Sequence, residues 1–180
     1  MIYVFLADGF EETEALATVD LLRRCELDVM TVGIGTDAVR GSHGILVKAD
    51  ISDDDVVLDS SVQMIVLPGG MPGTLNLERS STVQDAISFC VQKKIYIAAI
   101  CAAPSILGRR QLLAGLEATC FAGFESQLAG AELSDKKVCV SGNIITSKGP
   151  GTVFEFALKL VELLVSKQRS DVLAQSLMLD

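Results

Sequence analysis

Apolar runs alternate with segments of helical spacing along this chain. Mostly apolar runs, expected as strands, cover residues 2–7, 27–34, 63–67 and 95–100, and shorter ones cover 138–140 and 144–146. Periodic apolar positions predict helices over residues 11–25, 80–93, 153–165 and 170–179. Apolar strands that alternate with helices are typical of a parallel sheet buried on both faces. The pattern therefore predicts an α/β fold in which helices cover both faces of a mostly parallel sheet.

One apolar run ends at a cysteine. The run over 95–100 is followed by Cys101, then by small residues and Pro104, and a helix can begin at once after the cysteine. A sharp turn from strand to helix lifts one side chain clear of the sheet edge and directs free backbone N–H groups at it. Such groups favour a thiolate, so the sequence predicts a depressed pKa for Cys101 and a role as nucleophile or redox sensor. The alternative is a small, buried core cysteine.

The bulk composition fits one domain over residues 1–180. The chain is 49% hydrophobic and 21% charged, with a net charge of −8. An acidic surface of this kind argues against non-specific binding to nucleic acid or to an anionic membrane. No apolar stretch reaches the length of a membrane helix, and the first residues lack the pattern of a signal peptide.

The cysteine and histidine pattern restricts the chemistry further. Five cysteines are scattered without a CxxC pair, and His43 is the single histidine. This pattern disfavours a disulfide framework and a zinc site, so we expect no metal ligands. Free thiols indicate a reducing compartment, most simply the cytosol; an organelle remains open because a transit peptide could be missing.

Three segments follow predicted strands and are expected at one rim of the sheet. They are residues 8–14, residues 68–73 and the pair Cys101–Ala102. Ligands of such sheets bind beyond the carboxyl ends of the strands. Gly69 and Gly70 allow backbone N–H groups to approach a ligand closely, and with the N–H of Ala102 they could form an oxyanion hole. A plain strand-to-helix turn is the alternative for the two glycines.

Three glutamates begin the first predicted helix. Glu14 lies about one turn after Glu11, so the two can share a helix face. Most glutamates at a helix N-terminus only complement the dipole, and we expect two of Glu11, Glu12 and Glu14 to do no more than that. A protonated glutamate beside Cys101 would hydrogen-bond the thiolate and could move protons.

The chain resembles the ThiJ/PfpI family of class I glutamine amidotransferase-like domains over nearly its whole length. The resemblance rests on four motifs in order, over residues 8–14, 66–70, 98–104 and 146–157. It implies a flavodoxin-like three-layer sandwich, a homodimer and no cofactor. It also implies that Cys101 is the reactive cysteine, that Glu14 is its buried partner, and that Gly70 and Ala102 supply the oxyanion-hole N–H groups.

Two positions depart from what the resemblance implies. Phe121 stands where glyoxalase- and deglycase-type relatives often carry a histidine, which makes a Cys-His-acid peptidase doubtful. His43 falls near a position, often arginine, that reaches the neighbouring subunit's site in the family. It is a candidate cationic or acid–base group across the dimer, and a solvated surface histidine is the alternative.

Two functions stay open because both need a reactive thiolate. The first is a cofactor-independent glyoxalase III-type lyase or deglycase acting on methylglyoxal, glyoxal or early glycation adducts. In it Cys101 attacks the carbonyl, backbone N–H groups hold the oxyanion and Glu14 moves protons. The second is an oxidative-stress redox sensor or chaperone in which Cys101 is oxidised to a sulfinate. A thiamine-thiazole role, a third label of the family, lacks a phosphate site in the sequence.

Overall fold

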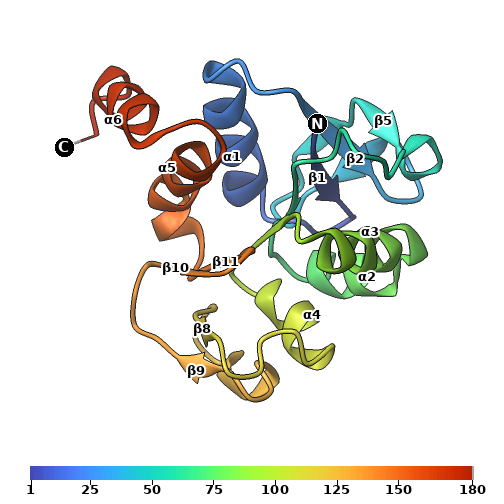
Figure 1. The fold of residues 1–180 in the computed structure, drawn as a ribbon. Coiled ribbons are helices and arrows are strands. Elements are labelled where there is room, and N and C mark those ends of the chain that lie inside the picture. Colours follow the sequence, from blue (N-terminus) through green and yellow to red (C-terminus); the bar gives the residue numbers. More distant parts are fainter. Residues whose placement is uncertain (180) are drawn as a thin grey trace.

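A seven-stranded sheet forms the centre of residues 1–179, the part of the chain that the computed structural model describes (Figure 1). In spatial order its strands are β10 (Val138–Ser141), β11 (Ile144–Ser147), β7 (Tyr96–Ile100), β6 (Met64–Leu67), β1 (Ile2–Leu6), β2 (Val29–Gly33) and β5 (Ile51–Ser52). Neighbouring strands pair in parallel except β10 and β11, which pair antiparallel. The order β2-β1-β6-β7-β11 is that of flavodoxin-like folds, which confirms the predicted fold class.

Helices cover both faces of this sheet. One face carries α1 (Glu12–Arg24), α5 (Val153–Leu164) and α6 (Lys167–Ser176), and the other carries α2 (Gly73–Arg79), α3 (Ser81–Lys93) and α4 (Pro104–Arg109). Alternate side chains of β1 enter the two cores. Val4 and Leu6 pack with α1 and α5, whereas Tyr3 and Phe5 pack with α2, α3 and α4. Period-two alternation in a fully buried strand thus supplies both layers of the sandwich.

Short elements complete the fold around the sheet edge. A hairpin of β3 (Ala38–Arg40) and β4 (Leu46–Lys48) carries His43 in its loop. The two-residue strands β8 (Glu117–Ala118) and β9 (Glu132–Leu133) pair in parallel. The 3-10 turns are η1 (Asp53–Asp55), η2 (Glu125–Gln127) and η3 (Pro150–Thr152). No helix within residues 1–179 combines the length and the apolar character needed to cross a bilayer.

Two helices begin at other residues than predicted, and one helix was not predicted. The last helix begins at Lys167, three residues early, because the Ser166 hydroxyl accepts the backbone N–H of Arg169 at 3.1 Å and caps it. The helix after Cys101 begins only at Pro104, with residues 101–103 in turns. Helix α2 was not expected, since its sequence GTLNLER contains the poor helix formers glycine and asparagine.

Candidate active site

Two loops interlock through glycines at the carboxyl ends of β1 and β6. Gly70 has a φ of +90°, and a Cβ there would lie 2.4 Å from the backbone nitrogen of Glu11. The N–H of Glu11 donates to the carbonyl of Gly69 at 2.9 Å, and that of Gly73 to the carbonyl of Gly9 at 3.2 Å. No larger residue fits at position 70, so glycine is required for the loops to hold the start of α1 against residues 69–70.

Cys101 occupies the sharp turn that the sequence predicted after β7. Its φ of +66° lies in the left-handed region, which costs a non-glycine residue of order 1–3 kcal/mol. Two backbone hydrogen bonds hold it there, from the Cys101 N–H to Ser147 O at 2.9 Å and from the Phe121 N–H to Cys101 O at 2.8 Å. Only 9% of the residue is exposed, so the thiol stands at the edge of a buried site.

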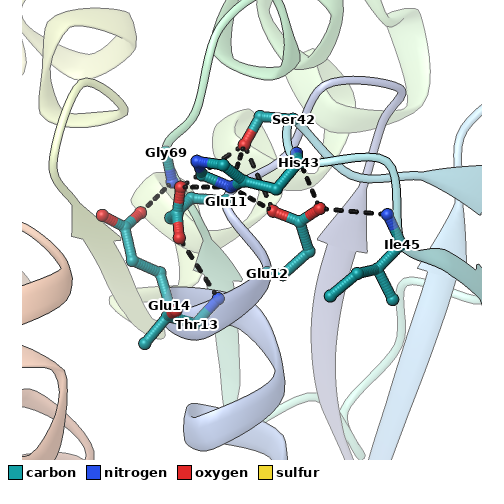
Figure 2. Close-up of polar contacts among 8 residues, drawn as sticks. All are labelled: Glu11, Glu12, Thr13, Glu14, Ser42, His43, Ile45 and Gly69. Carbon is teal, nitrogen blue, oxygen red and sulfur yellow. Dashed lines mark hydrogen bonds and ion pairs between the residues drawn. The ribbon is translucent and has the colours of Figure 1, made fainter.

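Glu14 is fully buried, and its carboxyl group meets the thiol across Gly69. Glu14 Oε2 accepts the Gly69 N–H at 2.7 Å (Figure 2). A Cβ built on Gly69 would lie 2.8 Å from that oxygen and 3.0 Å from Cys101 Sγ, so carboxyl and sulfur flank the same point. Glu14 Oε1 has no hydrogen-bond partner within the described residues. The Gly69 N–H is thus directed at the acid, whereas the sequence suggested that it would face a ligand.

The two titrating groups perturb one another. Burial raises the pKa of Glu14 to about 7. Hydrogen bonds from the Cys101 thiol and the Gly69 N–H act in the opposite direction and are the weaker effect. Burial also raises the pKa of Cys101, and the charge and hydrogen bond of Glu14 raise it further. The N–H groups of Gly70 and Ala102 favour the thiolate, but they do not outweigh burial. The predicted depressed pKa of Cys101 is therefore wrong, because the helix-terminus argument omitted the desolvation of the thiol.

These contacts define what the arrangement can do. Once the pair of Cys101 and Glu14 has lost one of its two protons, the remaining proton can sit on the sulfur or on the carboxyl group. Passing it from Cys101 to Glu14 creates a thiolate beside an acid. Gly70 and Ala102 direct their N–H groups at the sulfur side of the site, where an oxyanion formed by attack would also lie.

Glu12 is a buried residue for which sequence reasoning gave only a dipole role. Its Oε1 accepts the backbone N–H groups of His43 at 2.8 Å and Ile45 at 3.3 Å, and its Oε2 lies 2.9 Å from His43 Nδ1 (Figure 2). A Cβ on Gly41 would lie 2.2 Å from the same carboxyl group. Glu12 thus anchors the β3–β4 loop, and nothing in the run Glu11–Glu12–Thr13–Glu14 distinguishes it in advance.

His43 is held beside the start of α1. Its hydrogen bond to Glu12 raises its pKa, with the charges of Glu11 and Glu12 adding to the effect, and 69% of its side chain is exposed. Donor atoms of Glu11, Glu12 and His43 lie within 4.8 Å of one another, close enough to hold a cation. The same atoms bind the loop by hydrogen bonds, and we assign them to that role. A contact of His43 with a second subunit stays a prediction.

Comparisons with known proteins identify the family and the fold. The DJ-1/PfpI family matches residues 1–163. Protein dj-1beta of Drosophila melanogaster is 37% identical over 178 residues, which cover 97% of this chain and 95% of the relative. Glutathione-independent glyoxalase DJR-1.2 of Caenorhabditis elegans is 34% identical over 171 residues, covering 94% and 90%. The structure of oxidized Toxoplasma gondii DJ-1 superposes with a TM-score of 0.93 at 35% identity, covering 98% of this chain and 97% of that one.

Proposed function

The chain belongs to the DJ-1/PfpI family, and from that premise we propose that it is a cofactor-independent glyoxalase that uses Cys101 as its nucleophile. Its substrates are 2-oxoaldehydes such as methylglyoxal and glyoxal, and early glycation adducts of the same aldehydes. The observation that carries the proposal is the meeting of Cys101 and the buried acid Glu14 across Gly69. A relative that shares 34% of its residues is named a glutathione-independent glyoxalase, which supports the same reaction class.

The first step follows from the shared proton. Cys101 Sγ adds to the aldehyde carbon while its proton passes to Glu14, whose pKa of about 7 suits proton transfer near neutral pH. A C–S bond forms, and the C=O bond becomes an oxyanion held by the N–H groups of Gly70 and Ala102. Glu14 then returns that proton to the oxygen, which gives a hemithioacetal and leaves Glu14 ionised for the next step. No external thiol is needed, because the cysteine takes the place of one.

The second step moves a proton between the two carbons of the substrate. The hydrogen on the former aldehyde carbon leaves as a proton to the Glu14 carboxylate, the hydroxyl proton moves to the neighbouring oxygen, and Glu14 returns its proton to the neighbouring carbon. The first carbon is thereby oxidised to a thioester and the second reduced to an alcohol, so no redox cofactor enters the balance. Water then cleaves the thioester, releasing lactate or glycolate and restoring the thiol. The proposal also includes a cytosolic homodimer, as the family resemblance implies.

A redox sensor is the second candidate, and one comparison favours it. The related Toxoplasma gondii protein was solved in an oxidized form. In this chain a sulfinate on Cys101 would lie beside Glu14, which could donate a hydrogen bond to it when protonated.

Lactate formation from methylglyoxal without added thiol tests the proposal. Wild type and Cys25→Ser should form lactate, whereas Cys101→Ser should not; both cysteines are buried, so the pair is matched. Mass spectrometry of the peroxide-titrated protein is the second arm. Oxidation of Cys101 to a sulfinate with no lactate at any protein concentration would reject the glyoxalase and favour the sensor.

A further inference from the structure

A cavity of about 590 Å³ opens beside the nucleophile. Its walls come from the end of β8 and the segment after it, from the end of β9 and the residues after it, and from the turn between β11 and α5, over residues 118–122, 125, 133–135 and 148–152. The proton transfers proposed above use none of these side chains. A volume of this size lies within the range of small-molecule binding sites, roughly 300–1,000 Å³.

Gly149 and Phe121 form the boundary between this cavity and the sulfur. A Cβ built on Gly149 would lie 3.0 Å from the Phe121 ring and 3.9 Å from Cys101 Sγ. The Phe121 ring and the Cys101 sulfur therefore both lie next to the place that a side chain at position 149 would occupy. Both Gly149 and Phe121 line the cavity, so the cavity wall comes within contact distance of the sulfur at this point.

Phe121 is placed there by the backbone of the nucleophile. Its N–H donates to Cys101 O at 2.8 Å, and its carbonyl accepts the Phe124 N–H at 3.1 Å within the following turn. The side chain is nevertheless 46% exposed, and it lines the cavity. An aromatic ring that is fixed by the main chain but left half open offers its surface to a ligand.

Size and charge restrict what the cavity accepts. A methyl group is similar in size to a water molecule, which occupies about 30 Å³ in the liquid. The methyl group of methylglyoxal would therefore fill only a small part of the 590 Å³. Ala118, Ala122 and Leu133 add apolar wall beside Phe121. The ionisable groups of the lining are Glu125, Asp135 and Lys148, a net charge of −1, and Lys148 lies 3.8 Å from Asp135. An anionic substituent is therefore disfavoured.

We propose that this cavity binds the substituent of the substrate and that Phe121 selects 2-oxoaldehydes carrying an aryl group. The proposal rests on the proposed function for the reaction itself, but the cavity's selectivity can be measured without turnover. The covalent step is unchanged: Cys101 Sγ bonds to the aldehyde carbon, its proton passes to Glu14, and the aryl group lies against Phe121.

Three α-chloroketones test the cavity directly. Each alkylates a thiol with loss of chloride and a proton, and they differ in substituent: methyl in chloroacetone, phenyl in phenacyl chloride and carboxylate in chloropyruvate. Labelling is measured on the tryptic peptide 95–109, whose single cysteine is Cys101. The labelling rate of each reagent is divided by the rate at which the same reagent alkylates N-acetylcysteine. We expect a normalised preference for phenacyl chloride over chloroacetone of about tenfold or more, and discrimination against chloropyruvate.

Phe121→Ala should lower that preference about 2- to 12-fold, the range expected for one aromatic pair. Phe154→Ala is the matched control, because Phe154 is a similarly exposed phenylalanine outside the cavity lining, and it should leave the preference unchanged. Phe121→Leu, which keeps an apolar group, provides a second variant should the alanine variant not fold. A wild-type preference near one, or equal losses in the Phe121 and Phe154 variants, would overturn the proposal.

Turnover separates this inference from the proposed function. We expect kcat/KM for phenylglyoxal to exceed that for methylglyoxal, and the ratio to fall in Phe121→Ala. Lactate formation with no aryl preference in labelling or turnover would reject the cavity assignment and leave the glyoxalase standing. Aryl-selective labelling of Cys101 without acid formed from either aldehyde would reject the glyoxalase and leave the cavity assignment standing.

Discussion

Replacing Glu14 with glutamine should alter the pH dependence of stability in a specific direction. The carboxyl group is fully buried, and its pKa rises from 4.5 to about 7 on folding. The folded state therefore binds this proton more tightly than the unfolded state does. The stability that Glu14 contributes is fully present below its unfolded pKa and is lost as the pH rises through about 7. The rise in the pKa of Glu14 corresponds to about 3 kcal/mol of unfolding free energy between low and high pH.

Urea unfolding between about pH 5 and about pH 8 measures this effect. The wild type should lose about 2.5 kcal/mol of unfolding free energy relative to Glu14→Gln across that interval, because glutamine cannot ionise. Glu26→Gln, a change of the same chemistry at an exposed residue, should retain the wild-type slope. Parallel curves for wild type and Glu14→Gln would refute the reasoning.

The labelling of Cys101 gives a second readout of the same pair. In the wild type, the rate of alkylation by iodoacetamide should rise up to about pH 7 and then level off, because the remaining proton is shared with Glu14. In Glu14→Gln the rate should keep rising above that pH, since no base accepts the proton. A profile unchanged by the substitution would show that the acid does not titrate with the thiol.

Two further predictions concern the loops. Gly70→Ala places a Cβ 2.4 Å from the neighbouring backbone and should cost about 2 kcal/mol more than Gly35→Ala, where φ is +72° but no atom lies within 4 Å; equal losses of unfolding free energy by urea titration would show that only backbone strain matters. Glu12→Gln should lower the pKa of His43 toward its ordinary value, as monitored by NMR titration of the imidazole, and should leave the Cys101 site assembled; an unchanged pKa would contradict the assigned contact.

The fold was predictable because its main signal is local. The apolar run over residues 2–7 predicts a strand that is buried on both faces, and in the structure its alternate side chains enter two cores. Helix α2 was missed because its stability comes from tertiary burial of Leu77 and Thr74 and not from helix propensity. The strands β8 and β9, of two residues each, are too short to leave a period-two pattern.

The site was predictable only as far as topology determines it. Strand ends bring Cys101, Gly70 and the start of α1 to one rim, and that much follows from a parallel sheet. The raised pKa of Cys101 does not follow, because desolvation depends on how many elements pack around the sulfur. Likewise the roles of Glu12 and Glu14 differ only through the loops that fold over each, and no local pattern contains those loops.

Acid-quenched mass spectrometry of the protein during turnover of methylglyoxal tests the central claim most directly. The account predicts a mass increase of one methylglyoxal, present as the thioester, on peptide 95–109 of the wild type, and its absence both in Cys101→Ser and in Glu14→Gln, which lacks the acid that moves the protons. Lactate formed by the wild type with no adduct on that peptide in any of the three proteins, or lactate formed equally by Cys101→Ser, would contradict it.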